Sequence, residues 1–282
     1  MKYYVVTPAK NEEQFIRFTL DALIKQTLKP IKWIIIDDGS TDGTKAIVEK
    51  YQVENPWIEI ISIDNKQEKK LYGSKVVRAF NVGYKLIKNE EYDFIVKLDA
   101  DLSFPPDYFE KIASAFAGNS KLGICGGYIV EKENDFETKV SRYPRVQGAI
   151  KSVRTKCFND IGGFIEENGW DGLDLLNALY LGWEIENIPV NVIHHRMETA
   201  EYRSLKFFYN NGVTHYRQGN DLFLTLIRGL FMLKKKPLLL VSLSYLRGYI
   251  KAAITKQPKL VNKELAKFIR SYHYKRLFSF KR

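Results

Sequence analysis

Residues 94–101 read Phe-Ile-Val-Lys-Leu-Asp-Ala-Asp, a short apolar run followed at once by two carboxylates. An apolar run of this length predicts a buried strand. On an extended backbone Asp99 and Asp101 point to the same side, which suits them to hold a hard divalent cation that binds a phosphate. Aspartate is also common in turns, so the alternative is that these acids only end the strand. Phosphate-ester chemistry is the first hypothesis.

The sequence around this strand alternates between strand-like and helical patterns. Strict alternation predicts an α/β fold, in which a mostly parallel sheet is covered by helices on both faces. Less regular sequence after residue 130 is expected to complete the sheet. Ligands of such sheets bind beyond the carboxyl ends of the strands, where the acidic motifs fall. The expected strands are residues 3–7, 32–37, 58–63, 94–98, 123–128 and 184–193, and the expected helices are residues 12–26, 44–52, 74–88, 106–117 and 173–181.

The charge of the chain is divided unequally along its length. The 282 residues are 45% hydrophobic and 27% charged, which is ordinary for a folded protein, and the net charge is +11. From residue 202 onward, however, 18 Lys and Arg face only 2 acids. We therefore expect a first domain at residues 1–220 and a basic, amphipathic helical extension at residues 221–282 that meets an anionic surface, either membrane or nucleic acid.

The extension contains two apolar stretches, residues 222–233 and 237–250, separated by three lysines. Neither is long enough to span a bilayer, and Arg228 and Arg247 interrupt them. Helices that lie in the membrane interface are favoured, and the alternative is a helical extension docked on the main domain. Because basic side chains crowd into an apolar, aromatic segment, nucleic acid is not an expected partner.

Cysteine content and the N-terminal sequence bear on the compartment. Cys125 and Cys157 are the only cysteines and lack metal-ligand spacing, which favours a reducing environment. Residues 1–8 run straight into a predicted strand without an apolar leader. We expect a cytoplasmic protein, peripheral on the inner face of the cell membrane.

Three polar motifs carry a family resemblance. Residues 7–13, 37–42 and 99–101, in this order and spacing, resemble the donor-site motifs of the family 2 glycosyltransferases, and the resemblance covers roughly residues 3–220. It implies a GT-A fold, a nucleotide-sugar donor (UDP-, GDP- or dTDP-linked) and transfer that inverts the anomeric centre. It also implies that Pro8, Asn11 and Glu13 line the nucleotide pocket and that Asp38 accepts a hydrogen bond from the base.

A diphosphate beside Asp99 and Asp101 would be repelled unless a cation lay between them. We therefore expect bound Mg²⁺ or Mn²⁺, with Asp101 as the direct ligand and Asp99 nearer the ribose or a metal-bound water. In similar enzymes a histidine after the last strand completes the metal shell. Either His194 or His195 could face the cleft, and His195 is assigned. Arg196 is expected to bind the diphosphate through its planar guanidinium.

Other cations are placed by the resemblance alone. It puts Lys75 and Arg78 near the donor, and the alternative is a solvated helix face. Arg154 matches a basic position typical of the family, with structural and acceptor-binding roles equally open.

The resemblance implies a catalytic base in a Glu-Asp pair at the start of a helix after a Gly-Gly turn. The aspartate that the family resemblance requires falls on Gly172 in this chain. Asp171, one residue earlier, is the first candidate, and Asp174 is the second. The alternative for Asp171 is an N-cap of the helix.

The sequence thus predicts an inverting, metal-dependent glycosyltransferase that moves a sugar to a glycan or a lipid-linked acceptor. A sugar-1-phosphate nucleotidyltransferase would share the parallel sheet and the metal carboxylates. It would normally carry a Gly-rich phosphate loop after the first strand, where this chain has Pro8-Ala9-Lys10-Asn11-Glu12. A basic nucleic-acid-binding protein is the nonenzymatic alternative.

Overall fold

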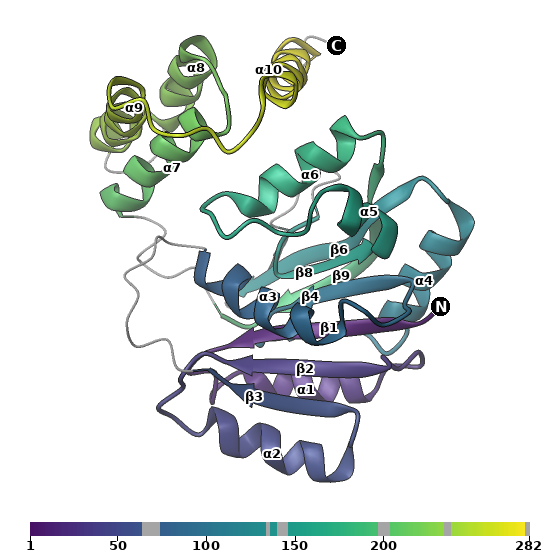
Figure 1. Cartoon of the computed structure of the whole chain (residues 1–282). Coiled ribbons are helices and arrows are strands. Elements are labelled where there is room, and N and C mark those ends of the chain that lie inside the picture. Colours follow the sequence, from purple (N-terminus) through teal and green to yellow (C-terminus); the bar gives the residue numbers. More distant parts are fainter. Residues whose placement is uncertain (64–73, 134–135, 140–145, 197–203, 234–237, 280–282) are drawn as a thin grey trace. The chain divides into compact units, whose positions relative to one another are not determined.

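A computed structural model describes residues 1–63, 74–133, 136–139, 146–196, 204–233 and 238–279 of the chain (Figure 1). The chain forms two compact units, Met1–Met197 and Glu198–Arg282. The sequence predicted the boundary after residue 220, whereas the two units divide after residue 197. Helix α7 (Leu205–Arg217) belongs to the second unit because it packs closely on helix α9 (Leu238–Ile254).

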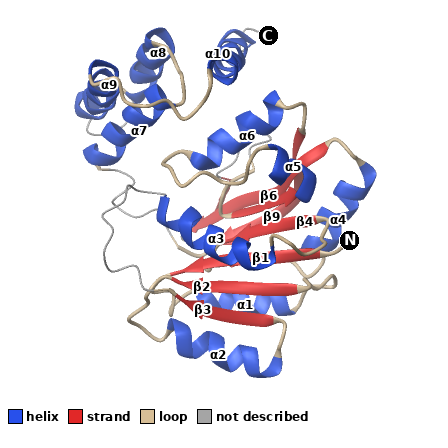
Figure 2. Ribbon diagram, viewed as in Figure 1, coloured by secondary structure: helices blue, strands red, loops and turns tan. Residues whose placement is uncertain are grey.

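The first unit is built on one twisted sheet, shown in red in Figure 2. Four strands, β3, β2, β1 and β4, are mutually parallel, so their carboxyl ends share one edge. The predicted α/β class and GT-A type of sheet are confirmed. These strands are β1 (Tyr3–Ala9), β2 (Lys32–Asp37), β3 (Ile58–Ser62) and β4 (Phe94–Leu98).

The remaining strands extend the sheet beyond β4. Strand β8 lies antiparallel to β4, and β6 lies between β8 and β9. The two-residue strand β5 pairs with the end of β9, and β7 pairs with β6. These strands are β5 (Leu102–Ser103), β6 (Leu122–Glu133), β7 (Phe136–Lys139), β8 (Ile150–Arg154) and β9 (Glu184–His194).

Helices cover both faces of the sheet because the side chains of each strand alternate between them. Tyr3 and Val5 of β1 join the core under α1, α2 and α4, whereas Tyr4 and Val6 join the core under α3, α5 and α6. Each fully buried large apolar side chain contributes about 1.5–3 kcal/mol. The helices are α1 (Ile16–Ile24), α2 (Thr44–Glu54), α3 (Ser74–Ile87), α4 (Tyr108–Gly118), α5 (Thr155–Asp160) and α6 (Trp170–Tyr180).

The second unit is helical. Besides α7 and α9 it contains α8 (Leu222–Met232) and α10 (Lys263–Phe278). Helices α7 and α9 cross at two glycines: a Cβ on Gly212 would lie 1.9 Å from the Tyr245 carbonyl oxygen, and one on Gly248 would lie 2.0 Å from the Tyr209 carbonyl oxygen. Within the described residues, no helix has the length and hydropathy needed to cross a bilayer.

Candidate active site

Hydrogen bonds tie the loop after β1 to the loop after β2. Asn11 has a left-handed φ of 53°, which asparagine tolerates better than most residues, and its Oδ1 accepts a hydrogen bond from the Thr41 N–H at 2.8 Å. Glu13 Oε2 accepts a hydrogen bond from the Gly43 N–H at 3.0 Å. The side chains of Asn11 and Glu13, predicted to line a nucleotide pocket, thus fix the loop after β2. Pro8 is half-buried within β1.

Two aspartates mark the end of β2. Asp37 closes the turn that follows, because its Oδ1 accepts a hydrogen bond from the Ser40 N–H at 3.0 Å and its Oδ2 accepts one from the Ser62 hydroxyl at 3.3 Å. Asp38 is buried beside the end of β1, and its N–H donates to the Ala9 carbonyl oxygen at 2.9 Å. The parallel register therefore brings the first two predicted motifs together.

Asp99 and Asp101 follow β4 at the same edge. The Asp99 carboxylate is half-buried and pairs with the buried ammonium of Lys97. Asp101 is buried, and its Oδ2 lies 3.2 Å from both His194 Nε2 and Arg196 Nε. Its other oxygen, Oδ1, is buried and has no hydrogen-bond partner among the described residues.

The acids at this edge differ in pKa because their burial and their neighbouring charges differ. Burial raises the pKa of Asp99, and the charge of Asp101 raises it further. Burial alone would raise the pKa of Asp101, but the hydrogen bond and charge of His194 hold it below its usual range. The reciprocal contact raises the pKa of His194 although burial opposes it. Burial raises the pKa of Glu12 to about 7. Asp101 is thus the acid of this group most strongly held in its ionised form.

His194, the last residue of β9, and His195, which follows it, face different neighbours, as adjacent residues of an extended chain do. His194 contacts Asp101, whereas His195 Nε2 lies 2.8 Å from the Ser103 hydroxyl oxygen. The His195 ring also stacks on Phe18 with centroids 3.8 Å apart. The structure therefore places His194 beside the candidate metal ligand, in the position assigned to His195 from the sequence.

Arg196 joins the start and the end of the first unit. Its guanidinium pairs with Glu12 and lies 5.2 Å from the centre of the Phe15 ring, while its Nε reaches Asp101. The pairing with Glu12 could not be read from the sequence, since 184 positions separate the two residues.

A second charged cluster lies on β8 and α6. Lys151 is fully buried, and its Nζ lies 2.6 Å from Asp171 Oδ1 and 2.6 Å from Asp174 Oδ2. Lys97 and Lys151 are paired neighbours on β4 and β8, and their ammonium groups lie 5.7 Å and 5.0 Å from the centre of the Trp170 ring. Both lysines were missed in the sequence analysis, although a lysine within a run of strand residues is a signal of a buried ion pair.

The two candidate bases differ in access. The Asp171 side chain is 30% exposed, whereas that of Asp174 is 3% exposed. Both Asp174 oxygens are engaged, because Oδ1 also accepts a hydrogen bond from the Leu175 N–H at 2.7 Å. Gly169 is the N-cap residue of α6, and Asp171 lies in the first turn, so the N-cap alternative for Asp171 is wrong.

The predicted cations outside these clusters have different surroundings. Arg154 pairs in register with Phe94, at the start of β4 and the opposite edge of the sheet from Asp99. Its guanidinium donates hydrogen bonds of 2.6–2.9 Å to the carbonyl oxygens of Phe116, Asn119 and Leu122. The structural alternative for Arg154 is thus supported and substrate binding is not.

Lys75 and Arg78 lie in the first turns of α3. Lys75 is exposed and Arg78 is half-buried. Residues 64–73, which lead into this helix, lie outside the described residues.

Comparison with known proteins places this site in a family. Residues 4–166 match the family described as Glycosyl transferase family 2. The chain belongs to this family. Its relatives include an uncharacterized glycosyltransferase of Haemophilus influenzae, 32% identical over 132 residues (46% of this chain and 38% of the relative). Another is the poly-β-1,6-N-acetyl-D-glucosamine synthase of Staphylococcus aureus, 27% identical over 189 residues (62% and 43%). The matches thus span less than half the length of either relative.

A solved structure extends the comparison to the fold. The mannosyltransferase PcManGT from Pyrobaculum calidifontis, in complex with GDP-Man and Mn²⁺, superposes with a TM-score of 0.57 at 14% identity. The superposition covers 98% of this chain and 81% of the mannosyltransferase. At this identity the likeness concerns the fold alone.

The chemistry of the two carboxylates after β4 fits a divalent cation in this family 2 chain. Asp101 Oδ1 is a buried carboxylate oxygen without a partner in the described residues, and Asp99 lies beside it with a half-buried carboxylate. Mg²⁺ and Mn²⁺ prefer oxygen ligands and often take several from phosphates and water. No group of three or more His, Cys, Asp or Glu in the described part of the chain is arranged to hold a metal by itself.

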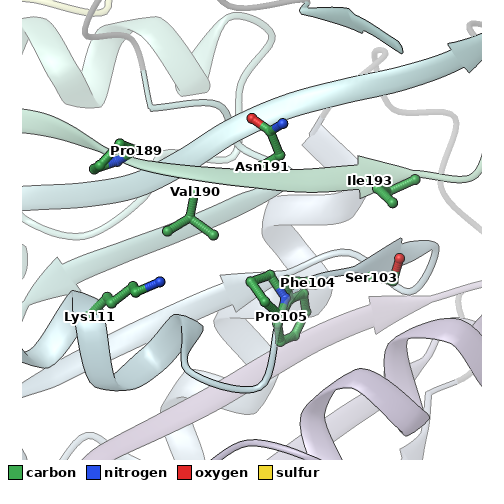
Figure 3. Close-up of a pocket in the computed structure, with 8 residues that line it drawn as sticks. All are labelled: Ser103, Phe104, Pro105, Lys111, Pro189, Val190, Asn191 and Ile193. Atoms are coloured by element: carbon green, nitrogen blue, oxygen red, sulfur yellow. The ribbon is translucent and has the colours of Figure 1, made fainter. Parts of the chain in front are cut away.

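An open pocket of about 690 Å³ lies along β9, β5 and the segment after β5 (Figure 3). Lys111 is the charged residue of its lining, and none of the candidate ligand or base carboxylates contributes to it. Ser103, at its margin, is the residue that contacts His195. The pocket of this family 2 chain therefore adjoins the site without containing its acids. Its lining consists of Ser103, Phe104, Pro105, Lys111, Pro189, Val190, Asn191 and Ile193.

Proposed function

We propose that this chain is an inverting glycosyltransferase that transfers a sugar from a nucleoside diphosphate donor with the help of Mg²⁺ or Mn²⁺. The observation that carries the proposal is the unpartnered, buried Oδ1 of Asp101 beside Asp99, at the edge where three parallel strands end. A bound cation would neutralise the leaving diphosphate. Asp99 and Asp101 would hold it there.

Asp171 is the proposed base. It is more exposed than Asp174, whose oxygens are both engaged. As the acceptor hydroxyl oxygen forms its bond to the anomeric carbon, Asp171 takes the hydroxyl proton. The bond from the anomeric carbon to the diphosphate oxygen breaks on the opposite face, and its electron pair leaves with the diphosphate. Attack opposite the leaving group inverts the anomeric centre.

The donor would be held by groups from several segments. Asp38 and Pro8 lie at the strand ends where the nucleotide is expected, and Lys75 and Arg78 at the start of α3 would supply positive charge. Arg196 is one-third exposed and could exchange Glu12 for a phosphate, because guanidinium binds both anions through the same fork of N–H groups.

We also propose a glycan or lipid-linked acceptor and a peripheral contact of the second unit with the inner face of the cell membrane. Helix α8 exposes Phe223, Leu230 and Phe231, each by more than half, and the surrounding sequence is strongly basic. Apolar side chains beside cations are typical of helices that lie at an anionic lipid surface. The similarity to a polysaccharide synthase supports a glycan product.

The donor proposal is tested by measuring nucleotide release from UDP-, GDP- and dTDP-sugars with Mg²⁺, Mn²⁺ or EDTA. One donor should bind and turn over only with metal, and Asp101→Asn should abolish metal-dependent binding. Asp107→Asn is the control, since Asp107 is an exposed acid that pairs with Lys111 on α4. Absence of binding to every donor, or full activity of Asp101→Asn, would refute the proposal.

The membrane contact is tested by sedimentation with vesicles of anionic or neutral phospholipid. Phe231→Glu should release the protein from anionic vesicles. Phe278→Glu changes a side chain of similar exposure on α10 and should not. Equal binding of both variants would place the contact elsewhere than α8.

A further inference from the structure

Lys151 is a buried cation that the proposed chemistry does not use. It is the second residue of β8, has no solvent exposure, and lies next to Lys97 across the strand pair. A buried lysine is rarely tolerated unless its charge is compensated and its N–H groups are hydrogen-bonded. The question is what this charge does in the site.

All three ammonium hydrogens of Lys151 have acceptors in α6. Nζ donates to Asp171 Oδ1 at 2.6 Å, to the Asp171 carbonyl oxygen at 3.2 Å and to Asp174 Oδ2 at 2.6 Å. Two of the three contacts therefore hold one residue, Asp171, by both its main chain and its side chain. Because an ammonium has only three N–H donors, Lys151 uses all of its donors in hydrogen bonds to α6.

The space around Asp171 is also restricted by Gly148. A Cβ on Gly148 would lie 3.0 Å from Asp171 Oδ1 and 2.9 Å from the ring of Trp170. The Trp170 ring, in turn, packs against the ammonium of Lys151 at 5.0 Å from its centre. Oδ1 of Asp171 thus lies close both to a buried cation and to the backbone of Gly148.

Charge balance gives a reason for the contact of Lys151 with two carboxylates, those of Asp171 and Asp174. If Asp171 alone faced Lys151, the ion pair would stabilise its charged form and make it a weaker base. Asp174 supplies a second negative charge, so Lys151 and Asp174 together form a nearly neutral pair. Burial raises the pKa of Asp174 to about 6, which still leaves it ionised at neutral pH.

We propose that Lys151 is a positioning residue for the base Asp171, and that Asp174 is the counter-ion that balances the charge of Lys151 beside it. The inference rests on the proposed glycosyl transfer. It assigns different tasks to the two acids and gives the buried lysine a part in the reaction. Other charged or titratable groups around the cluster are Lys97 and Asp99 across Trp170, and Cys157 of α5.

The test compares wild type, Asp174→Asn and the double variant Lys151→Met/Asp174→Asn in transfer assays over a range of pH, with the donor found active. In Asp174→Asn the lysine charge acts on Asp171 alone. The acid side of the pH–rate profile should move to lower pH by about 1 unit, and the maximal rate should fall. An unchanged profile would overturn the role of Asp174 as counter-ion.

The double variant removes a carboxylate and an ammonium together, so no unpaired buried charge remains at position 174. It should fold, keep the KM for the donor and lose about 100-fold in kcat, since Asp171 is no longer held in place. A wild-type kcat would show that Lys151 only balances charge. If the double variant melts well below wild type, Lys151→Gln/Asp174→Asn makes the same comparison with a side chain that still donates a hydrogen bond. Hydrolysis of the donor without acceptor is measured in parallel. If the wild-type protein does not hydrolyse any donor, the proposed function itself has failed, and the comparison of variants does not bear on Lys151.

Discussion

Replacement of Lys151 by methionine alone provides the sharpest test of the buried charge cluster. The change leaves Asp174, whose side chain is 3% exposed, without its cationic partner and beside the partly exposed Asp171. Removing one partner of a buried ion pair typically costs about 3–5 kcal/mol. For a unit of this size that cost lowers the melting temperature by roughly 6–20 °C.

The loss should depend on pH in a defined direction. A carboxyl whose pKa is raised on folding lowers stability above its folded pKa, and the penalty disappears as the pH falls toward its unfolded pKa. For Asp174 in wild type the rise from 3.8 to about 6 corresponds to roughly 3 kcal/mol at pH 7 and above. Without Lys151 the pKa of Asp174 rises further, so Lys151→Met should destabilise more at pH 8 than at pH 5.

Urea unfolding at pH 5 and pH 8, followed by tryptophan fluorescence, measures both effects. Lys97→Met is the matched control. Its partner Asp99 is 31% exposed and can turn toward water, so the control should lose less stability than Lys151→Met. Equal destabilisation of Lys151→Met at the two pH values, or a loss below 1 kcal/mol, would refute the reasoning.

Three further predictions concern residues whose surroundings the structure defines. Arg154→Met should lower the free energy of unfolding by about 1–3 kcal/mol, because it leaves carbonyl oxygens at the end of α4 without donors, and it should not change the KM for the donor. A raised KM in steady-state kinetics with unchanged stability would contradict the structural role. His194→Gln should weaken the Mn²⁺ dependence of transfer more than His195→Gln, as judged by metal titration of activity, and the reverse order would return the metal role to His195. Gly212→Leu should separate α7 from α9, and a loss of helical signal by circular dichroism together with faster proteolysis of the second unit would report it.

The parallel half of the sheet could be predicted because each of its strands is marked by a pattern of residues that are adjacent in the sequence. Residues 94–98 and 32–37 are apolar runs of strand length, and the polar residues that follow them must gather at one edge once the strands are parallel. The match to residues 4–166 confirms the family that these motifs indicated. Strand β8 was not foreseen, since its short mixed sequence lacks a clear period.

The details of the site depended on long-range pairing that no local pattern reports. Which of His194 and His195 reaches Asp101 is decided by the register of β9 with β6 and β5. Likewise, the burial of Lys151 follows from the cover that α6 lays over β8, and Arg154 lies at the far edge because β8 runs antiparallel to β4. Spacing along the chain gives the residue types of a site, whereas the orientation of each side chain follows from its neighbours in the sheet.

The Glu12–Arg196 ion pair has a consequence for biosynthesis. It joins the first loop of the unit to its last residues, and Asp101 needs the same terminal segment for its contacts with His194 and Arg196. During translation the strands that carry Asp38 and Asp99 emerge long before that segment does. The charged cluster of Glu12, Asp101, His194 and Arg196 is therefore completed only after residue 196 has left the ribosome. A nascent chain that ends before residue 194 lacks both contacts of Asp101, the one with His194 and the one with Arg196.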